Sequence, residues 1–271
     1  MATAMSAAFV LREAEEAYRK RSKEFLSSHQ LADFRKCPLL YRQKKSGMIA
    51  DEDRPAYQIG RAAHTLILEG RACFKEHYAV GGPINPKTGA PYGTGTKAYA
   101  EWAEAQGRPV LTPEQAALVE AMAAGVQANA EAQRLLASGI PEGVVRANYR
   151  GLDCQIRMDW FSADHGIVDF KTADDLTWFE ADARRFGYVH QVAFYRSVLA
   201  LVMGETPDSI PVHFIGVEKK QPYRCGVWLV APESLRQAAT ENEAAMERLK
   251  QCERTGVWTT GYESRRVFEH F

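Results

Sequence analysis

The sequence predicts an α/β protein in which a central mixed β-sheet is flanked by helices and preceded by a helical N-terminal region. Three β-rich segments separated by short turns, over residues 144–149, 154–161 and 166–170, are typical of an antiparallel meander. Segments with the helical spacing of apolar residues stand before and after this meander. Two more β-rich segments near the C-terminus complete the predicted sheet.

Composition fits a globular protein of this class. The 271 residues include 34 Lys and Arg against 34 Asp and Glu, and 46% are hydrophobic. These values exclude a disordered, collagen-like or coiled-coil chain. A net charge of zero argues at first against a protein uniformly coated in positive charge for nucleic acid. No apolar run approaches the roughly 18 residues that cross a bilayer, and the N-terminus lacks the basic start of a secretory signal, so we expect a cytoplasmic protein without membrane contact.

The cysteines give no metal or disulfide signal. They lack a Cys-x-x-Cys pair and a histidine partner at zinc-ligand spacing, so we expect reduced thiols in the core. Their positions are Cys37, Cys73, Cys154, Cys225 and Cys252.

The N-terminal half is predicted to be mainly helical. Amphipathic spacing predicts a surface helix over 9–25 with a basic end, and Ser27 or Ser28 caps a short helix through Phe34 that Pro38 stops. A polar loop over 44–55 leads to a strongly patterned helix over 57–70, which ends at a glycine. Residues 81–97 are rich in Gly, Pro and Thr and are expected to form a long loop.

The second half alternates helices and strands. Helix resumes near Tyr99, and residues 112–115 carry a capping Thr, a Pro and a Gln that start a helix expected to end near Ser138. After the meander we predict helices over 177–186, 188–203 and 232–252 and strands over 212–218 and 223–230. Neither an internal repeat nor a long linker divides the chain. We therefore predict one domain over 1–271, with a helical region over about 1–56 and a core over about 57–252.

Two carboxylates and a lysine are expected to converge in the meander. Asp169 and Lys171 share one face of a strand because side chains alternate, and a turn at 163–166 would bring Asp159 of the preceding strand close to Asp169. Converging carboxylates bind a hard cation such as Mg²⁺, and a lysine can offset charge on a phosphoryl transition state. The pattern suits metal-assisted phosphodiester hydrolysis, although such an Asp and Lys on an exposed strand are commonly only a solvated ion pair.

Four other polar residues accompany this triplet. His64 lies in an Ala- and Leu-rich helix, Glu142 stands just before the meander, and Gln191 and Tyr195 are four apart on one helix face. Taken singly, each has an ordinary explanation: a buried core histidine, a strand-edge Glu and an amphipathic helix with a buried Tyr. Their order along the chain makes them informative.

In that order, the motifs resemble the PD-(D/E)xK nuclease superfamily and, within it, the exonuclease VIII (RecE-type) branch of phage and prophage recombination nucleases. The resemblance covers about residues 24–250 and implies a restriction-endonuclease-like core. The matching segments are LSS at 26–28, CPLLY at 37–41, GRAAHTLILE at 60–69, PE at 141–142, CQIRMDW at 154–160, IVDFKT at 167–172 and GYVHQVAFY at 187–195.

The resemblance implies a metal site. Asp159 and Asp169 would bind Mg²⁺, for which Mn²⁺ would substitute, together with the Phe170 backbone carbonyl. His64 would add a further ligand, and such a mixed nitrogen and oxygen set suits either ion. Glu142 would act beside the site, on a second metal through water.

It also implies the groups that handle the substrate. Lys171 would orient the nucleophilic water, and Gln191 and Tyr195 would line the site and touch the scissile phosphate or the DNA end. Arg61, close to the histidine, is a further candidate for a phosphate contact. No iron–sulfur cluster is expected, because Cys37 is not followed by the C-terminal cysteine triplet of sibling nucleases.

The implied activity is 5′ to 3′ degradation of one strand of linear double-stranded DNA, which leaves a 3′ overhang for recombination by strand annealing. The family implies a homo-oligomeric ring, a trimer or tetramer, that acts on DNA ends with a single-strand annealing protein. One alternative is a structure-specific or repair endonuclease on the same fold. Another is a DNA-binding or scaffold protein whose acidic site has lapsed, against which the intact Asp159, Asp169 and Lys171 count.

Basic residues are concentrated in the N-terminal quarter, where they could form a rim that faces DNA. For any single one of them a solvated helix face is the more ordinary explanation. Zero net charge then predicts that basic residues line one face while the rest of the surface is neutral or acidic. The residues are Lys20, Arg21, Lys23, Arg35, Lys36, Arg42, Lys44 and Lys45.

Overall fold

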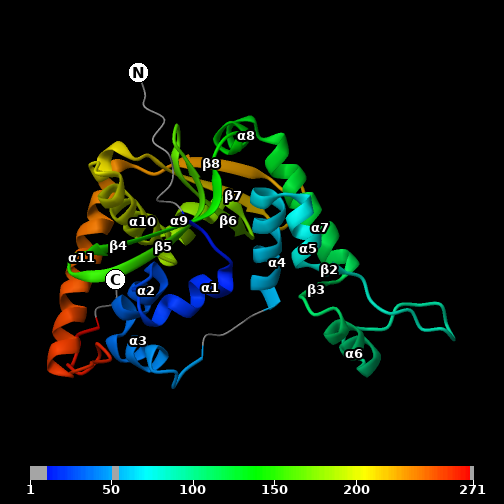
Figure 1. Cartoon of the computed structure of the whole chain (residues 1–271), viewed down its shortest axis with the longest axis horizontal. Helices are drawn as coiled ribbons and strands as arrows, with labels where there is room; N and C mark the ends of the chain where they lie inside the picture. The colour runs from blue at the N-terminus through cyan, green and yellow to red at the C-terminus, as the bar shows by residue number, and fades with distance from the viewer. Residues whose placement is uncertain (1–10, 51–54, 269–271) are drawn as a thin grey trace.

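A six-stranded mixed sheet runs through the middle of the molecule, in the strand order β1-β4-β5-β6-β7-β8 (Figure 1). The computed structural model describes residues 11–50 and 55–268. Strands β6 and β7 pair in parallel, while the other neighbours in this sheet are antiparallel, so the predicted mixed sheet and the meander β4-β5-β6 are confirmed. The strands are β1 (Leu11–Arg12), β4 (Ile140–Tyr149), β5 (Leu152–Ser162), β6 (Gly166–Ala173), β7 (Val212–Glu218) and β8 (Cys225–Leu229).

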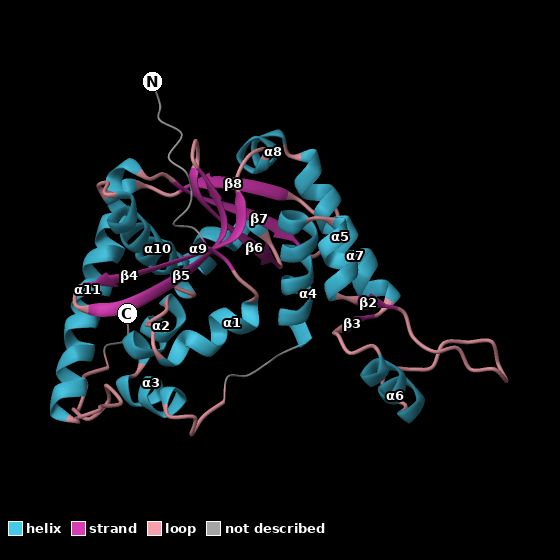
Figure 2. Cartoon of the chain, in the orientation of Figure 1, coloured by secondary structure: helices cyan, strands magenta, loops and turns pink. Residues whose placement is uncertain are grey.

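Helices cover both faces of this sheet, as predicted (Figure 2). Consecutive strand residues point to opposite faces, and Ile167 and Val168 accordingly belong to two different hydrophobic cores. The Ile167 core is covered by α2 (Ser28–Lys36), α9 (Phe179–Arg185), α10 (Tyr188–Met203) and α11 (Pro232–Thr255). The Val168 core is covered by α4 (Pro55–His64), the π-helix η2 (Thr65–Glu69), α5 (Arg71–His77), α7 (Pro113–Ala128) and α8 (Ala130–Leu136).

The remaining elements lie outside these two layers or connect them. A short parallel pair closes the base of an extension that carries the long loop and one helix, and this extension projects away from the sheet (Figure 1). Within residues 11–50 and 55–268, no helix has both the length and the apolar character that crossing a bilayer requires. The elements are β2 (Ala79–Val80), β3 (Val110–Leu111), α1 (Glu15–Lys20), α3 (Pro38–Lys45), α6 (Lys97–Ala105) and the 3-10 helices η1 (Arg21–Lys23), η3 (Leu176–Trp178) and η4 (Pro207–Ser209).

The first predicted helix is wrong over its N-terminal part. Leu11 and Arg12 form β1, whose partners in β4 are Val144 and Gly143. The helix α1 is therefore much shorter than the predicted 9–25, of which residues 9 and 10 lie outside the described residues. Pairing with the edge of β4 satisfies backbone groups that local helical propensity would have paired within the segment.

Two other differences concern helix ends. Ser27 caps α2 through a capping box with Gln30, as its sequence indicates, and α2 ends before Pro38 as predicted. Pro38 then begins a further helix, α3, which was not predicted from the sequence; a proline suits the first helical position because its missing N–H would have no partner there. The single helix predicted from residue 112 is broken at Asn129. Its side chain accepts a hydrogen bond from Ala132 N at 3.0 Å and donates one to the Cys225 carbonyl of β8 at 2.9 Å.

Gly166 is expected to tolerate no side chain. Its φ is +70°, and a Cβ there would lie 2.1 Å from the Pro211 carbonyl oxygen. A Cβ at Gly204, with φ +68°, would meet no atom of the described residues within 4 Å. We expect Gly204→Ala to lower the free energy of unfolding by about 1–2 kcal/mol, the cost of left-handed backbone. Gly166→Ala should lower the free energy of unfolding by about 1–3 kcal/mol more than Gly204→Ala does, because the added methyl group overpacks the site. Urea unfolding measures both, and equal losses in the two variants would contradict the clash.

Candidate metal centre where β5 and β6 diverge

The ladder between β5 and β6 ends partway along both strands. Its last pair is Trp160 with Val168, while β6 continues in register along β7. If the ladder continued, Asp159 would pair with Asp169. Instead, the Asp159 carboxylate oxygen Oδ2 accepts the hydrogen bond that Phe170 N donates, at 2.8 Å. A side chain thus takes the place of a backbone partner, and the two strands separate around it.

Three ligand atoms meet beside this divergence. His64, Glu142 and Asp159 each bring one nitrogen or oxygen within 4.8 Å of the other two. Glu142 lies on β4 opposite Asp159, between the pairs that Pro141 and Gly143 make with β5. Its φ is 54°, a left-handed conformation that is rare for a residue other than glycine and costs about 1–3 kcal/mol. The backbone is therefore strained at the point where it presents this carboxylate.

His64 reaches the site from the end of α4, where the helix widens into η2. Such π-turns are frequent at functional sites because they shift the side chains that follow. The imidazole packs edge to face on the Phe170 ring, with centroids 5.0 Å apart, and its Nδ1 lies 3.7 Å from Asp159 Oδ2. Burial lowers the pKa of His64 more than the Asp159 carboxylate raises it, which favours the neutral form that binds metals.

Asp169 and Lys171 lie on the strand face that looks toward α10. Asp169 is 0% exposed, and its Oδ2 is 2.5 Å from Lys171 Nζ, which also sits 4.9 Å from the centre of the Tyr188 ring. Among the residues that the structure describes, Asp169 Oδ1 has no hydrogen-bond partner. Burial raises the pKa of Asp169 to about 7, although the lysine opposes this. A buried carboxylate oxygen without a partner is a group that a divalent cation would satisfy.

Negative charge is in excess at this centre. Burial, followed by repulsion from Asp159, raises the pKa of Glu142 to about 8, although Arg157 Nε lies 2.8 Å from its carboxylate. Carboxylates that repel one another at partly buried positions are typical of a cation site. Together with the His64 nitrogen they form a donor set that fits Mg²⁺ or Mn²⁺. The backbone of Phe170 contributes to the pKa of His64 by raising it, although burial outweighs this effect.

The α10 residues are placed differently from one another. Gln191 is half-buried, and its Nε2 donates to the Tyr195 hydroxyl at 2.9 Å. Tyr195 is only 4% exposed, within the core. Its burial favours a role in positioning the Gln191 amide over the direct contact with DNA that the sequence predicted. Arg61 is half-buried on α4, one turn before His64.

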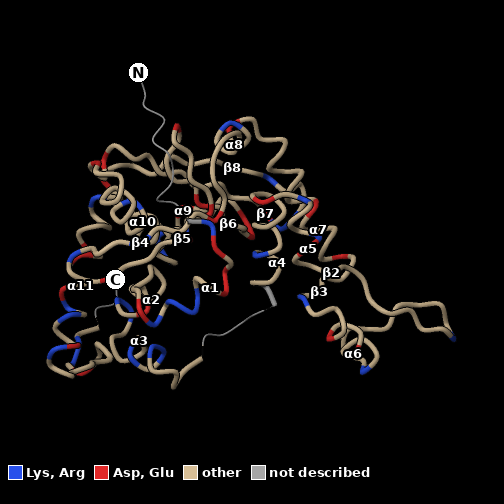
Figure 3. The backbone as a smooth tube through the Cα atoms, viewed as in Figure 1, with Lys and Arg blue, Asp and Glu red and all other residues tan. Residues whose placement is uncertain are grey.

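Sequence reasoning missed Arg157. It precedes Asp159 by two residues and so shares its strand face, and this alternation is the signal that could have identified it. The expected basic rim is also less positive than the residue count indicates, because acidic residues stand among the lysines and arginines of the N-terminal helices (Figure 3) and some of these opposite charges form ion pairs. Three such ion pairs are Lys20 with Glu16, Lys44 with Asp33 and Lys45 with Glu253.

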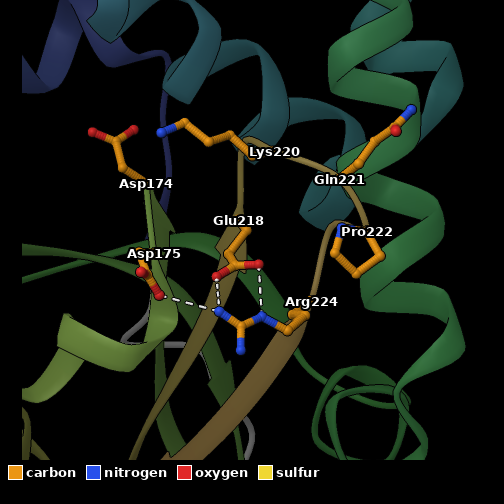
Figure 4. Close-up of a pocket in the computed structure, with 7 residues that line it drawn as sticks. All are labelled: Asp174, Asp175, Glu218, Lys220, Gln221, Pro222 and Arg224. Carbon is orange, nitrogen blue, oxygen red and sulfur yellow. Dashed lines mark hydrogen bonds and ion pairs between the residues drawn. The ribbon is translucent and has the colours of Figure 1, made fainter.

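A pocket of about 420 Å³ lies beyond the centre, past the carboxyl ends of β6 and β7 (Figure 4). Arg224 there is 2.6 Å from Glu218 and 3.1 Å from Asp175. The hydrogen bonds from Arg224 lower the pKa of Glu218. Burial raises the pKa of Glu142 and Asp169 at the metal centre instead, so the pocket lacks the destabilised carboxylates that mark that centre. Its lining residues are Asp174, Asp175, Glu218, Lys220, Gln221, Pro222 and Arg224.

Comparison with known proteins agrees with this fold. A family model described as a PDDEXK-like domain of unknown function (DUF3799) matches residues 27–267. A crystal structure of a "Putative exonuclease" from Eubacterium rectale has a TM-score of 0.67 and 19% sequence identity, and 96% of each chain is covered. LHK-Exo in complex with dAMP matches more weakly, with a TM-score of 0.32, 15% identity and coverage of 88% of this chain and 93% of that one. No curated protein matches the sequence.

Without a bound metal, the protein is expected to lose stability as the pH rises through the range in which Glu142 and Asp169 lose their protons. The pKa of Glu142 is raised from 4.5 to about 8, and that of Asp169 from 3.8 to about 7. The folded state therefore binds their protons more tightly than the unfolded chain does. The stability that these two groups contribute is therefore highest below their pKa values in the unfolded chain. It is lost completely above their pKa values in the folded protein. Urea unfolding in the presence of a chelator measures this decline, and Mn²⁺ should reverse it at the alkaline end.

Glu142→Gln should flatten the decline, since the amide has nearly the shape of the carboxyl group but cannot lose a proton or carry the negative charge. Glu120→Gln is the matched control, because Glu120 pairs with Arg71 at the surface, 2.5 Å away. A wild-type profile that stays flat in chelator between acid and alkaline pH would show that the carboxylates do not repel one another as the structure indicates.

Proposed function

The chain belongs to the PDDEXK-like family DUF3799, within the PD-(D/E)xK nuclease superfamily, and on that premise we propose that it is a metal-dependent exonuclease that degrades one strand of linear duplex DNA from 5′ to 3′. The observation that carries the nuclease assignment is the meeting of His64, Glu142 and Asp159 beside the buried Asp169 and the half-buried Lys171. The polarity rests on the resemblance to RecE-type enzymes.

The chain's own residues would hold the cation and the substrate in place. His64, Glu142, Asp159 and Asp169, with the Phe170 carbonyl, would hold the cation, which when bound polarises a phosphoryl oxygen and lowers the pKa of a bound water. The backbone N–H of Phe170 donates to the Asp159 carboxylate and so fixes its position. Arg157 holds Glu142 and limits its repulsion of Asp159.

Lys171 is fixed at two points, by Asp169 and by the face of Tyr188. An ammonium group held in this way can donate to the attacking water and stabilise the extra charge that develops on the phosphate oxygens. The Gln191 amide has two N–H bonds, of which one serves Tyr195. The second can donate to a phosphate oxygen without adding charge.

Loss of either member of the buried ion pair is expected to abolish digestion. Asp169→Asn keeps the shape of the side chain, and Lys171→Met removes the charge, so each should lower kcat by about 100-fold or more, as loss of transition-state stabilisation does. Lys219→Met is the matched control, because Lys219 pairs with Asp174 at 2.8 Å just past the ends of β6 and β7. Rates are measured on linear duplex DNA with Mg²⁺ or Mn²⁺.

Circular dichroism and urea unfolding show whether each variant folds. Lys171→Met leaves Asp169 buried without its cation and is the more prone to misfold, in which case Asp169→Asn carries the test. Wild-type rates in a folded Asp169→Asn variant, or full wild-type activity in excess chelator, would contradict the mechanism.

The end dependence of cleavage separates the proposed exonuclease from its alternative, a structure-specific or repair endonuclease. Linear duplexes labelled at one end and carrying a defined 5′ phosphate on one strand should lose that strand progressively from its 5′ end. Covalently closed circular duplex should remain intact under the same conditions. Nicking of the circle, or degradation that begins at 3′ ends, would overturn the exonuclease polarity while leaving the nuclease assignment in place.

We also propose that the whole chain is one nuclease domain and that it forms a homo-oligomeric ring, a trimer or tetramer, around DNA. Packing of Leu31 and Phe34 of α2 into the same core as α10 and α11 supports the single domain. The ring, and a single-strand annealing protein that receives the 3′ strand in recombination, rest on the family resemblance. Light scattering of the purified protein measures the mass of the assembly.

A further inference from the structure

Three side chains of metal-binding type follow one another on the helical segment just after His64. Glu69 is the last residue of η2, and Cys73 and His77 lie on α5, each four residues further along. One atom from each lies within 4.8 Å of the other two. Glu69 and Cys73 are half-buried and His77 is exposed, so the cluster can be reached from solvent.

The two distances from the Cys73 sulfur are close to those of a tetrahedral zinc site. Cys73 Sγ is 3.6 Å from Glu69 Oε2 and 3.9 Å from His77 Nδ1. Bonds of about 2.3 Å to sulfur and about 2.0 Å to nitrogen and oxygen, at tetrahedral angles, place ligand atoms about 3.5 Å apart. Small side-chain rotations would therefore bring all three atoms to a common ion, with a fourth position left for water.

We propose that Glu69, Cys73 and His77 form a second metal site, which binds a thiophilic divalent cation of the Zn²⁺ class. Binding exchanges the thiol proton of Cys73 for the metal, and the proton is released to solvent. A sulfur and an imidazole nitrogen select Zn²⁺ or Co²⁺, whereas the carboxylate-rich centre at Asp159 suits Mg²⁺ or Mn²⁺. The two sites thus differ in the kind of ion that they bind.

A role for this second ion follows from where the ligands lie. Glu69 and Cys73 stand on either side of Gly70, whose φ of 90° bends the path between η2 and α5. An ion that joins them would fix this bend, six residues after His64. It would also neutralise Glu69, whose charge adds to the repulsion felt by Glu142. The second site would therefore stabilise the helical segment that carries His64, a proposed ligand of the first site.

A reactive thiol is the main alternative explanation for Cys73. Reactive cysteines have a lowered pKa, from a nearby cation or a helix N-terminus. Burial, and then the Glu69 carboxylate, raise the pKa of Cys73 instead. The alignment of Glu69, Cys73 and His77 is thus better explained by metal binding than by nucleophilic or redox chemistry.

Titration of the full-length reduced protein with Co²⁺ tests this site by a signal specific for sulfur ligation. We expect about one equivalent per chain to produce a thiolate-to-cobalt charge-transfer band in the near ultraviolet, and Zn²⁺ to displace it. Cys73→Ser should abolish the band, and His77→Ala should weaken Co²⁺ binding by about tenfold or more. Cys252→Ser is the matched control, because Cys252 is another half-buried free thiol, on α11.

Asp159→Asn separates this site from the nuclease centre, since the charge-transfer band should persist in that variant while binding at the hard-cation centre is weakened. A wild-type protein that shows no band at saturating Co²⁺ would overturn the proposal, as would a band that survives Cys73→Ser. His77 is exposed, so His77→Ala is expected to fold and keeps the test decisive if the cysteine variant does not. None of these outcomes depends on nuclease activity.

Discussion

The hydrogen bond from Phe170 N to the Asp159 carboxylate is the interaction on which the candidate centre depends. A backbone N–H in a sheet normally donates to the next strand, and leaving it unpaired in the interior is costly. Here a carboxylate accepts it, so the ladder between β5 and β6 can stop without an orphaned donor. The strands are then free to separate, and polar side chains gather at the middle of a sheet that is otherwise covered on both faces by apolar cores.

This gap lets the two faces of the sheet share one site. Asp169 and Lys171 point toward α10, because Lys171 lies over Tyr188. His64 packs on Phe170, which points the opposite way. In a closed sheet these groups would be separated by a layer of backbone. At the divergence they surround Asp159, whose charge acts on His64, Glu142, Asp169 and Lys171 alike.

The same arrangement costs stability when no cation is present. Three carboxylates lie at partly or fully buried positions, with Arg157 and Lys171 as their cationic neighbours. Glu142 is moreover held in a left-handed conformation. Backbone strain and like charges at one place are typical of sites kept for chemistry, since neither contributes to folding. The overall balance of 34 basic and 34 acidic residues therefore says little about DNA binding, because the distribution of charge decides it.

Local rules determined much of this protein from the sequence alone. The alternation of a strand put Asp169 and Lys171 on one face, capping residues placed the starts of α2 and α7, and the patterns of α10 and β7 gave their ends correctly. Non-local contacts decided the rest. Pairing with β4 turned Leu11 and Arg12 into a strand, the Cys225 carbonyl drew Asn129 out of a helix, and the divergence at Asp159 recruited Arg157 and Glu142. Even the spacing of Cys73 and His77 acquired meaning only once Glu69 was placed beside them, because a ligand set is defined by distances in space that sequence separation does not fix.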